Sequence, residues 1–214
     1  AASVSISPER VQISSPPDFE MSGDARTGSP VASEEVLYHR RLPAVQAFAR
    51  AHGLDRVIFD APRKRLGIVA TGKAYLDVRQ SLEELGLDEA RALDLGLCLY
   101  KVALTWPLEP EGALEFAAGL EHLLVVEEKR PLVEDQFKTL LYSQERRPEM
   151  AGKRDRNGEA LVPDTGELSM RAVRGAIRKW LSQVASGVGP ELRDEPAAPI
   201  RVAAGGPALQ RMPG

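Results

Sequence analysis

Thr71-Gly72-Lys73 is the first of three short stretches whose side chains could do chemistry. It follows an apolar run and precedes a run of helical periodicity. A helix N-terminus of this kind can receive a phosphate through its free backbone amides, with the lysine adding charge. A P-loop, however, requires Gly-x-x-x-x-Gly-Lys-Ser/Thr, whereas Gly67 falls inside the apolar run and Ala74 follows the lysine. The stretch favours a plain strand-to-helix turn, with an anion or ligand contact as the alternative.

The second stretch, Glu127-Glu128-Lys129-Arg130, follows another apolar run. Open α/β sheets bind ligands beyond the carboxyl ends of their strands, which is where these four residues are expected to lie. Adjacent carboxylates on a strand point in opposite directions, so Glu127 and Glu128 make a poor acid/base pair. Either carboxylate could pair with Lys129, with Lys73 or with a neighbouring subunit. A helix-start cluster with local ion pairs and an interface role therefore stay open as equal alternatives.

The third stretch is Trp106-Pro107, a bulky and rigid corner at a strand end that favours packing over chemistry. The single cysteine, Cys98, lies within an apolar run and is expected to be a buried, unreactive small hydrophobe. One cysteine cannot build a metal or cluster site, and the three histidines show no ligand spacing. The residues alone yield no catalytic constellation.

Length and composition limit the number of domains and the classes of partner that the chain can have. Its 214 residues correspond to one ordinary domain plus a remainder. With 28 basic and 31 acidic residues, the net charge of −3 favours neither nucleic acid nor an anionic membrane as a partner. There is no apolar run near the roughly 18 residues that a membrane span needs. Cysteine usage fits a reducing cytoplasm.

The two ends of the chain have the composition of linkers. Residues 1–33 contain eight Ser, four Pro and two Gly, and residues 186–214 contain five Pro and five Gly. Such segments bury too little apolar surface to offset the entropy of ordering them. We therefore expect one domain over residues 34–185.

Within this domain, strand and helix signals alternate. Strands are expected at 56–59, 65–70, 97–104 and 123–126, with a weak edge strand at 148–152. Helices are expected over 34–52, divided or kinked at Pro43, and then from about 75, 88, 110, 131 and 169. Because parallel crossovers place helices on both faces of a sheet, the pattern predicts an α/β fold with a mostly parallel sheet.

Three motifs, in one order, resemble the middle of the indolepyruvate ferredoxin oxidoreductases, particularly the large single-chain bacterial form. They are residues 66–78 (LGIVATGKAYLDV), 101–110 (KVALTWPLEP) and 124–134 (LVVEEKRPLVE). Residues 152–158 and 161–168 add further pieces of similar character. The resemblance covers almost the whole chain, although its two ends match loosely.

The resemblance implies both a fold and a reaction. Enzymes of this family decarboxylate aryl 2-oxoacids with thiamine diphosphate and magnesium. They pass electrons through [4Fe-4S] clusters to ferredoxin and form acyl-CoA. The resembling region is their transketolase C-terminal-like domain, which lies between the thiamine pyrimidine-binding and diphosphate-binding domains. Its fold is a three-layer α/β/α sandwich with a five-stranded sheet in the order 1-3-2-4-5, strand 1 being antiparallel.

The resemblance implies no catalytic residue in this chain. The Gly-Asp-Gly…Asn motif that holds the metal diphosphate and the Cys-x-x-Cys sets are missing, and the family's catalytic glutamate belongs to the preceding domain. We therefore expect a non-catalytic assembly domain that binds no cofactor itself. Residues 1–33 and 186–214 would lead to the two neighbouring domains.

The expected partners are these neighbouring domains, a second subunit of a homodimeric full enzyme, and ferredoxin or a similar electron acceptor. The face toward them is expected at the strand ends: Thr71, Gly72, Lys73, Trp106, Pro107, Glu127, Glu128, Lys129 and Arg130. The alternative is a stand-alone binding module that uses the same face for an anionic ligand such as coenzyme A.

Overall fold

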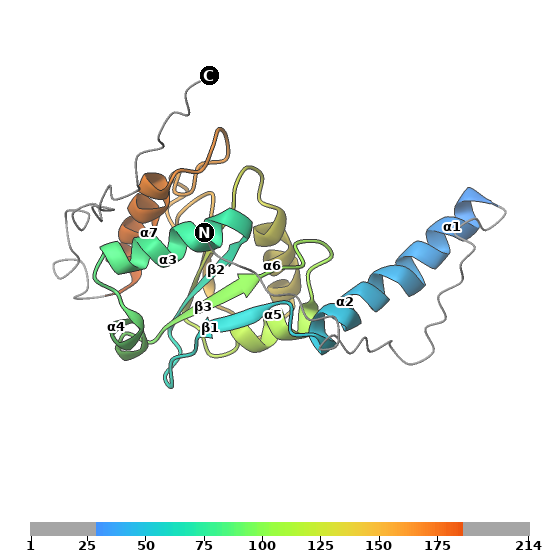
Figure 1. Cartoon of the computed structure of the whole chain (residues 1–214), viewed down its shortest axis with the longest axis horizontal. Helices are drawn as coiled ribbons and strands as arrows, with labels where there is room; N and C mark the ends of the chain where they lie inside the picture. The colour runs from blue at the N-terminus through green and yellow to red at the C-terminus, as the bar shows by residue number, and fades with distance from the viewer. Residues whose placement is uncertain (1–28, 186–214) are drawn as a thin grey trace, which may run out of the picture.

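The computed structural model describes residues 29–185, which fold around one five-stranded sheet (Figure 1). The strands are β1 (Arg56–Phe59), β2 (Leu66–Thr71), β3 (Leu97–Val102), β4 (His122–Val126) and β5 (Glu149–Ala151). Their order is β1-β3-β2-β4-β5, with β1 antiparallel to β3 and the other pairs parallel. The predicted α/β class and the mostly parallel five-stranded sheet are confirmed, in the order that the resemblance implies.

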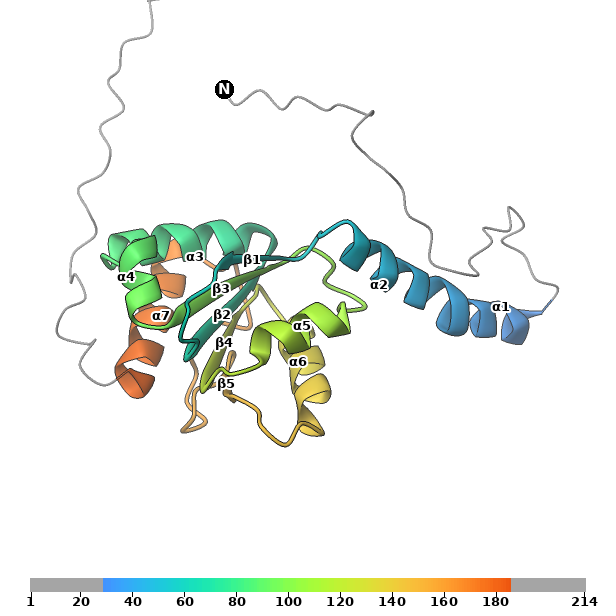
Figure 2. The same ribbon diagram turned by 90° about the horizontal axis from the view of Figure 1, so that it is seen from below.

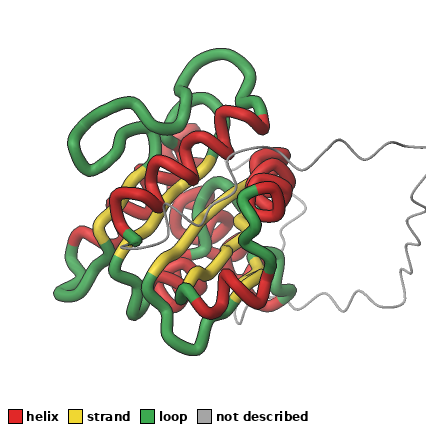
Figure 3. The backbone as a smooth tube through the Cα atoms, turned by 90° about the vertical axis from the view of Figure 1, so that its left-hand side faces the viewer, coloured by secondary structure: helices red, strands yellow, loops and turns green. Residues whose placement is uncertain are grey.

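Helices cover both faces of this sheet. They are α3 (Gly72–Glu84), α4 (Glu89–Asp94), α5 (Pro110–Ala117), α6 (Leu132–Tyr142) and α7 (Met170–Val184). Figure 2 shows α3, α4 and α7 on one side of the strands and α5 and α6 on the other. Seen from the side in Figure 3, the yellow strands lie between red helices. This is the predicted three-layer sandwich.

The central strand β2 is buried on both faces, as its continuous apolar run predicts. On one face, Ile68 packs in a core that includes Trp180 of α7 and Leu82 of α3. On the other face, Val69 packs in a core that includes Phe116 of α5 and Phe137 of α6. The two cores hold the strands in place, and thereby position the strand ends at which the candidate residues lie.

Two predicted helix caps are confirmed. The Asp88 carboxylate accepts a hydrogen bond from the Arg91 amide at 2.9 Å, at the start of α4. The Ser169 hydroxyl accepts one from the Ala172 amide at 3.3 Å, at the start of α7. Each bond satisfies an amide that has no partner inside its own helix.

A helical arm precedes the sheet. It consists of α1 (Pro30–Val36), a π-helical turn η2 (Leu37–Arg41) and α2 (Leu42–Ala51). The division expected at Pro43 takes the form of this π turn, in which the Leu42 amide donates to the Leu37 carbonyl. Proline has no amide hydrogen, so it cannot continue the regular pattern of helical bonds.

The arm begins four residues before the expected start at Glu34. The Ser29 hydroxyl caps the Ala32 amide, and Pro30 suits the first turn of a helix. The rest of the two expected linkers, residues 1–28 and 186–214, lies outside the described residues. Within residues 29–185, no helix combines the length and apolar character needed to cross a membrane.

Gly96 and Gly175 provide a matched test of the backbone. Gly96 has a φ of +74°, and a Cβ there would lie 2.5 Å from the Arg63 carbonyl oxygen. Gly175 lies within α7, and a Cβ there would meet nothing within 4 Å. We expect Gly96→Ala to lower the free energy of unfolding by about 1–3 kcal/mol. Gly175→Ala should raise it by up to about 1 kcal/mol. Urea unfolding measures the free energy of unfolding of both variants. An equal change in this free energy at the two positions would contradict the described backbone.

Candidate functional site

The carboxyl ends of the four parallel strands meet at one edge of the sheet. This strand-end face is built from the start of α3 and from the loops that follow β3, β4 and β5. All nine residues predicted for the site lie on these segments. The topology thus brings together stretches that are separated by up to about 60 positions in the sequence, as parallel pairing requires.

Glu127 directly follows β4, and its side chain turns inward. It is 3% exposed, and its two carboxylate oxygens accept the amides of Val133 and Glu134, each at 2.9 Å. These are first-turn amides of α6, which have no partner inside the helix. Burial raises the pKa of Glu127, while the amide donors and the nearby Lys153 oppose that rise. Glu127 therefore fixes the start of α6 and is not free to contact a ligand.

Lys153 reaches the same place from the loop after β5. Its Nζ donates to the carbonyl oxygen of Glu127 at 2.5 Å and to that of Pro163 at 3.1 Å. The Lys153 backbone amide donates to the carboxylate of Glu134 at 2.9 Å. Burial lowers the pKa of Lys153, and the carboxylates of Glu127 and Glu134 partly offset this effect. Both Lys153 and Glu134 are less than 9% exposed, and the sequence analysis missed both as parts of the site.

A sequence signal for Lys153 existed. Residues 152–158 and residues 161–168 resemble the family, and the first piece contains Lys153 while the second contains Pro163. What the sequence could not show is that the ammonium group bridges them. Glycine is also needed at position 152, because a Cβ there would clash with the carboxylate of Glu134.

Lys73 and Lys129 both hold the segment 163–168, which we call the strap. Lys73 Nζ donates to the carbonyl of Leu168 at 3.0 Å and to the carboxylate of Asp77 at 3.0 Å. Lys129 Nζ donates to the carbonyl of Gly166 at 2.6 Å. The hydrogen bond that Lys73 donates to the Asp77 carboxylate raises the pKa of Lys73. Two of the predicted ligand-face lysines thus contact the chain's own backbone.

Of the second stretch, Glu128, Lys129 and Arg130 are exposed. Glu128 forms a long ion pair with Lys129, 3.9 Å between nitrogen and oxygen. Lys129 has a φ of +64°, a left-handed conformation that ends the strand sharply. The side chain of Glu127 is therefore buried and that of Glu128 is exposed to solvent. Opposite directions are what we predicted for adjacent residues at a strand end.

Trp106, which the sequence placed on the face toward partners, is 52% exposed. It precedes Pro107 through a cis peptide bond and lies in the segment 103–109, which we call the Trp106 loop. Leu132, at the start of α6, is also exposed, at 47%. The strand β3 ends at Val102, two residues before the expected end at Leu104, so Trp106 lies in a loop beyond the sheet.

The Trp106 loop is held from two sides by side chains. The carboxylate of Asp55 accepts the amides of Ala103 at 2.6 Å and Leu104 at 3.1 Å. The side chain of Gln136 accepts the amide of Leu108 at 2.8 Å and donates to the carbonyl of Thr105, also at 2.8 Å. Backbone groups on both sides of the exposed tryptophan are therefore fixed.

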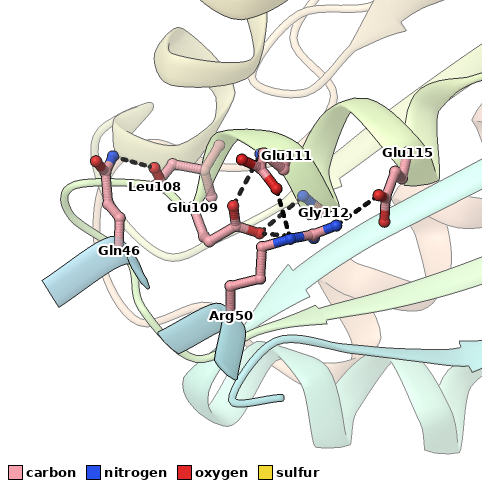
Figure 4. A network of polar contacts seen from close by, with 7 residues as sticks. All are labelled: Gln46, Arg50, Leu108, Glu109, Glu111, Gly112 and Glu115. Carbon is pink, nitrogen blue, oxygen red and sulfur yellow. Dashed lines mark hydrogen bonds and ion pairs between the residues drawn. The ribbon is translucent and has the colours of Figure 1, made fainter. Parts of the chain in front are cut away.

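The arm holds the loop from a third side (Figure 4). Gln46 of α2 donates to the carbonyl of Leu108 at 2.7 Å. One turn later, Arg50 forms ion pairs with three carboxylates along α5: Glu109 at its N-cap (3.5 Å), Glu111 in its first turn (2.7 Å) and Glu115 in its last turn (2.5 Å). Glu109 is buried and caps α5 through the amides of Glu111 and Gly112. This contact joins segments 59 positions apart, which no local pattern could reveal.

The described residues do not fit a magnesium-diphosphate or cluster site. No group of three or more His, Cys, Asp or Glu side chains within residues 29–185 is placed to hold a metal ion. The inward carboxylates of Glu127 and Glu134 already accept amide and lysine donors. Cys98 is fully buried, as predicted, and its sulfur accepts the Ala61 amide at 3.4 Å. Burial raises the pKa of this thiol, which disfavours the reactive thiolate.

Comparison with known proteins agrees with the resemblance. The family model described as "Indolepyruvate oxidoreductase domain" matches residues 56–194. This chain belongs to that family. It is 36% identical to indolepyruvate oxidoreductase subunit IorA of Pyrococcus abyssi over 118 residues, 55% of this chain and 16% of the relative. With the same subunit of Methanothermobacter thermautotrophicus it shares 30% identity over 152 residues, 69% of this chain and 23% of the relative. The family member thus spans less than a quarter of these relatives' length.

Two solved structures are also similar to this family member. One is a split-gene transketolase described as an inactive beta4 tetramer, with a TM-score of 0.40, 22% identity, and coverage of 61% of this chain and 42% of the other. The second is the 2-oxoglutarate:ferredoxin oxidoreductase of Magnetococcus marinus. Its TM-score is 0.41 at 18% identity, with coverage of 59% and 21%. Membership of the family rests on the sequence matches.

Substitution of Lys153 tests the buried network. We expect Lys153→Met to lower the free energy of unfolding by about 2–4 kcal/mol, because two charge-assisted hydrogen bonds are lost and two carbonyls are left buried. Lys129→Met removes one exposed bond and should cost less than about 1 kcal/mol. Urea unfolding gives both values. Equal losses would show that the buried ammonium has no special role.

A pH series tests a second anchor of the same loop, Asp155. Its fully covered carboxylate accepts Lys179 at 2.7 Å and Gln183 at 3.0 Å. These donors hold the pKa of Asp155 well below its usual range. A lowered folded-state pKa contributes stability above the unfolded-state pKa, about 4, and this is lost as the pH falls further. The wild-type chain should therefore exceed Asp155→Asn in unfolding midpoint at pH 7, and the gap should narrow below about pH 4. A gap that is constant from pH 7 to 3 would contradict this.

Proposed function

We propose that this chain is a non-catalytic assembly domain of an indolepyruvate ferredoxin oxidoreductase. The observation that carries the proposal is that the polar groups inside the strand-end face are bound internally while an aromatic side chain on it is exposed. Its buried carboxylates and Lys153 form hydrogen bonds with the chain's own groups, while Trp106 is exposed to solvent on a loop that is fixed on three sides. Exposed tryptophans with fixed backbones are typical of the anchors of protein interfaces.

The surroundings of Trp106 support an interface rather than a reaction site. The Gln136 side chain donates to the carbonyls of both Thr105 and Leu132, so the exposed Leu132 lies close to the Trp106 loop. Lys129 and Arg130 add charge nearby along the sequence. An apolar centre with a polar rim is the usual anatomy of a protein contact. The partner that fits best is a neighbouring domain of the same polypeptide, since this chain covers only 16–23% of its relatives.

In this proposal the whole enzyme decarboxylates aryl 2-oxoacids to acyl-CoA and reduces ferredoxin. Thiamine diphosphate, magnesium and [4Fe-4S] clusters would be held by its other domains. Residues 34–185 form the assembly domain, and residues 1–33 and 186–214 are linkers to the neighbours. The full enzyme is a homodimer in the cytoplasm, in line with the single buried cysteine.

Trp106→Asp in the full-length enzyme tests the interface role. We expect loss of activity and of stable assembly, because a charge would enter an apolar contact. In the 214-residue chain the same change should leave the urea midpoint nearly unchanged, since Trp106 is 52% exposed there. Tyr142→Asp, at an 80% exposed tyrosine at the other end of α6, is the matched control. Full activity of Trp106→Asp enzyme would sink the proposal.

The alternative, a binding module for an anionic ligand such as coenzyme A, makes a different prediction. Because Lys73 and Lys129 donate to the strap, we expect no saturable heat when coenzyme A is titrated into the 214-residue chain. Saturable binding that Lys73→Met abolishes would favour the ligand module. Thiamine diphosphate serves as the second titrant.

A further inference from the structure

A cavity of about 310 Å³ lies between the end of α2, the strands β1 and β3, and α5. Ala49, Val57 and Phe116 form an apolar part of its wall. Figure 4 shows Arg50 of α2 and Glu109 at the start of α5 facing each other at this place. None of the nine predicted strand-end residues lines the cavity, so it is separate from the site described above. Its volume suits a small organic molecule.

Tyr100 of β3 lines this cavity with a hydroxyl that has no hydrogen-bond partner within residues 29–185. The residue is 3% exposed, and its ring stacks on that of Phe116 with 4.8 Å between the ring centres. Burial and the nearby carboxylates of Asp55 and Glu109 raise the pKa of Tyr100, so the hydroxyl keeps its hydrogen. A buried hydroxyl without a partner costs free energy, which a ligand that contacts the hydroxyl would recover.

Gly112 keeps the space beside this hydroxyl open. A Cβ at position 112 would lie 2.9 Å from the Tyr100 hydroxyl oxygen and 2.7 Å from Oε2 of Glu109. Any larger residue would therefore place its side chain against both polar groups. Glycine leaves that space to the cavity, which all three residues line.

The charges around the cavity are not balanced. Its lining contains two cations and four carboxylates, which are Arg50, Lys64, Asp55, Asp60, Glu109 and Glu115. Lys64 pairs with Asp60 at 2.8 Å, and Arg50 pairs with both glutamates. Asp55 forms no ion pair within the described part of the chain, and its Oδ2 atom is buried without a hydrogen-bond partner. Burial raises the pKa of Asp55, although two backbone amides oppose the rise. A cation is therefore the charge that this cavity lacks.

We propose that this cavity binds a small organic ammonium ion. The ammonium group donates a hydrogen bond to the Tyr100 hydroxyl oxygen, and the carboxylate of Asp55 balances its charge. The apolar body of the ligand contacts Val57 and Phe116. An anionic ligand does not fit, because both cations of the lining are already paired with carboxylates. This site goes beyond the interface role proposed above and does not depend on it.

The cavity shares two residues with the anchors of the Trp106 loop. Asp55 lines the cavity, and its Oδ1 atom accepts the amides of Ala103 and Leu104 in that loop, at 2.6 and 3.1 Å. Glu109, the last residue of the loop, also lines the cavity. An ammonium ion beside Asp55 is therefore expected to change the surroundings of Trp106, which does not itself line the cavity.

Titration of the 214-residue chain with benzylamine at pH 7, followed by NMR of its backbone amides and tryptophan indoles, tests the site. Benzyl alcohol and benzoate are the neutral and anionic probes of similar shape. We expect benzylamine to give saturable shifts at the amides of Val57 and Gly112 and at the indole of Trp106. Benzyl alcohol should bind at least about tenfold more weakly, because it lacks the charge that Asp55 balances. Benzoate should give no saturable shift.

Two variants and a control locate the binding. Tyr100→Phe removes only the hydroxyl and should weaken benzylamine binding at least about tenfold, while the urea midpoint does not fall because the hydroxyl has no partner in the chain. Asp55→Asn keeps an oxygen for the loop amides but removes the charge, and should weaken binding at least as much. Tyr142→Phe, at an 80% exposed tyrosine, should bind as the wild-type chain does.

Three results would overturn the proposal. The first is the absence of saturable shifts with benzylamine. The second is binding of benzoate that is as tight as that of benzylamine, since the paired cations would then be the recognition groups. The third is benzylamine binding that neither Tyr100→Phe nor Asp55→Asn weakens.

Discussion

The buried ammonium group of Lys153 connects three parts of the molecule that are distant in sequence. Through the carbonyl of Glu127 it reaches the end of β4, and through the carbonyl of Pro163 it reaches the strap. The Lys153 amide adds the link to α6 through Glu134. Removing a charge from water is costly, so a buried lysine is tolerated only where such partners are placed for it. This set of bonds ties the loop after β5 to the sheet edge.

The residues at the strand ends form two layers, an inner one that is buried and an outer one that is exposed, and this division bears on function. The inner layer, formed by Glu127, Glu134 and Lys153, is hydrogen-bonded to groups of the chain itself. The outer layer presents Trp106 on a loop that Asp55, Gln136 and Gln46 fix. A rigid exposed aromatic loses little entropy on binding, which suits a contact between domains. In the proposed function, the face on which open α/β proteins usually bind ligands serves instead for contact with other protein surfaces.

Much of the fold could be predicted because its signals are local. The apolar runs bounded by glycine and proline predicted all five strands, and the caps at Asp88 and Ser169 were readable from single residues. The strand order and the antiparallel β1 were not. They depend on pairing between distant segments, and they came from the resemblance to a family rather than from periodicity.

The site was harder, for a physical reason. The nine predicted residues share one edge because parallel strands end together, but their contacts depend on distant segments. Arg50 meets Glu109 across 59 positions, and Lys153 meets Glu127 across 26. The sequence favoured packing over chemistry for the rigid Trp106-Pro107 corner and placed Trp106 on the face toward partners. Nothing local indicated that α2, α6 and Asp55, the residue before β1, would hold its loop.

The most direct measurement of the central claim is hydroxyl-radical footprinting of Trp106 in two contexts, the 214-residue chain and the full-length enzyme. Tyr142, exposed at the opposite end of α6, serves as the internal reference. If the strand-end face contacts a neighbouring domain or subunit, Trp106 will be oxidised readily in the isolated chain and strongly protected in the full enzyme, while Tyr142 changes less. Equal oxidation of Trp106 in both contexts would contradict the claim.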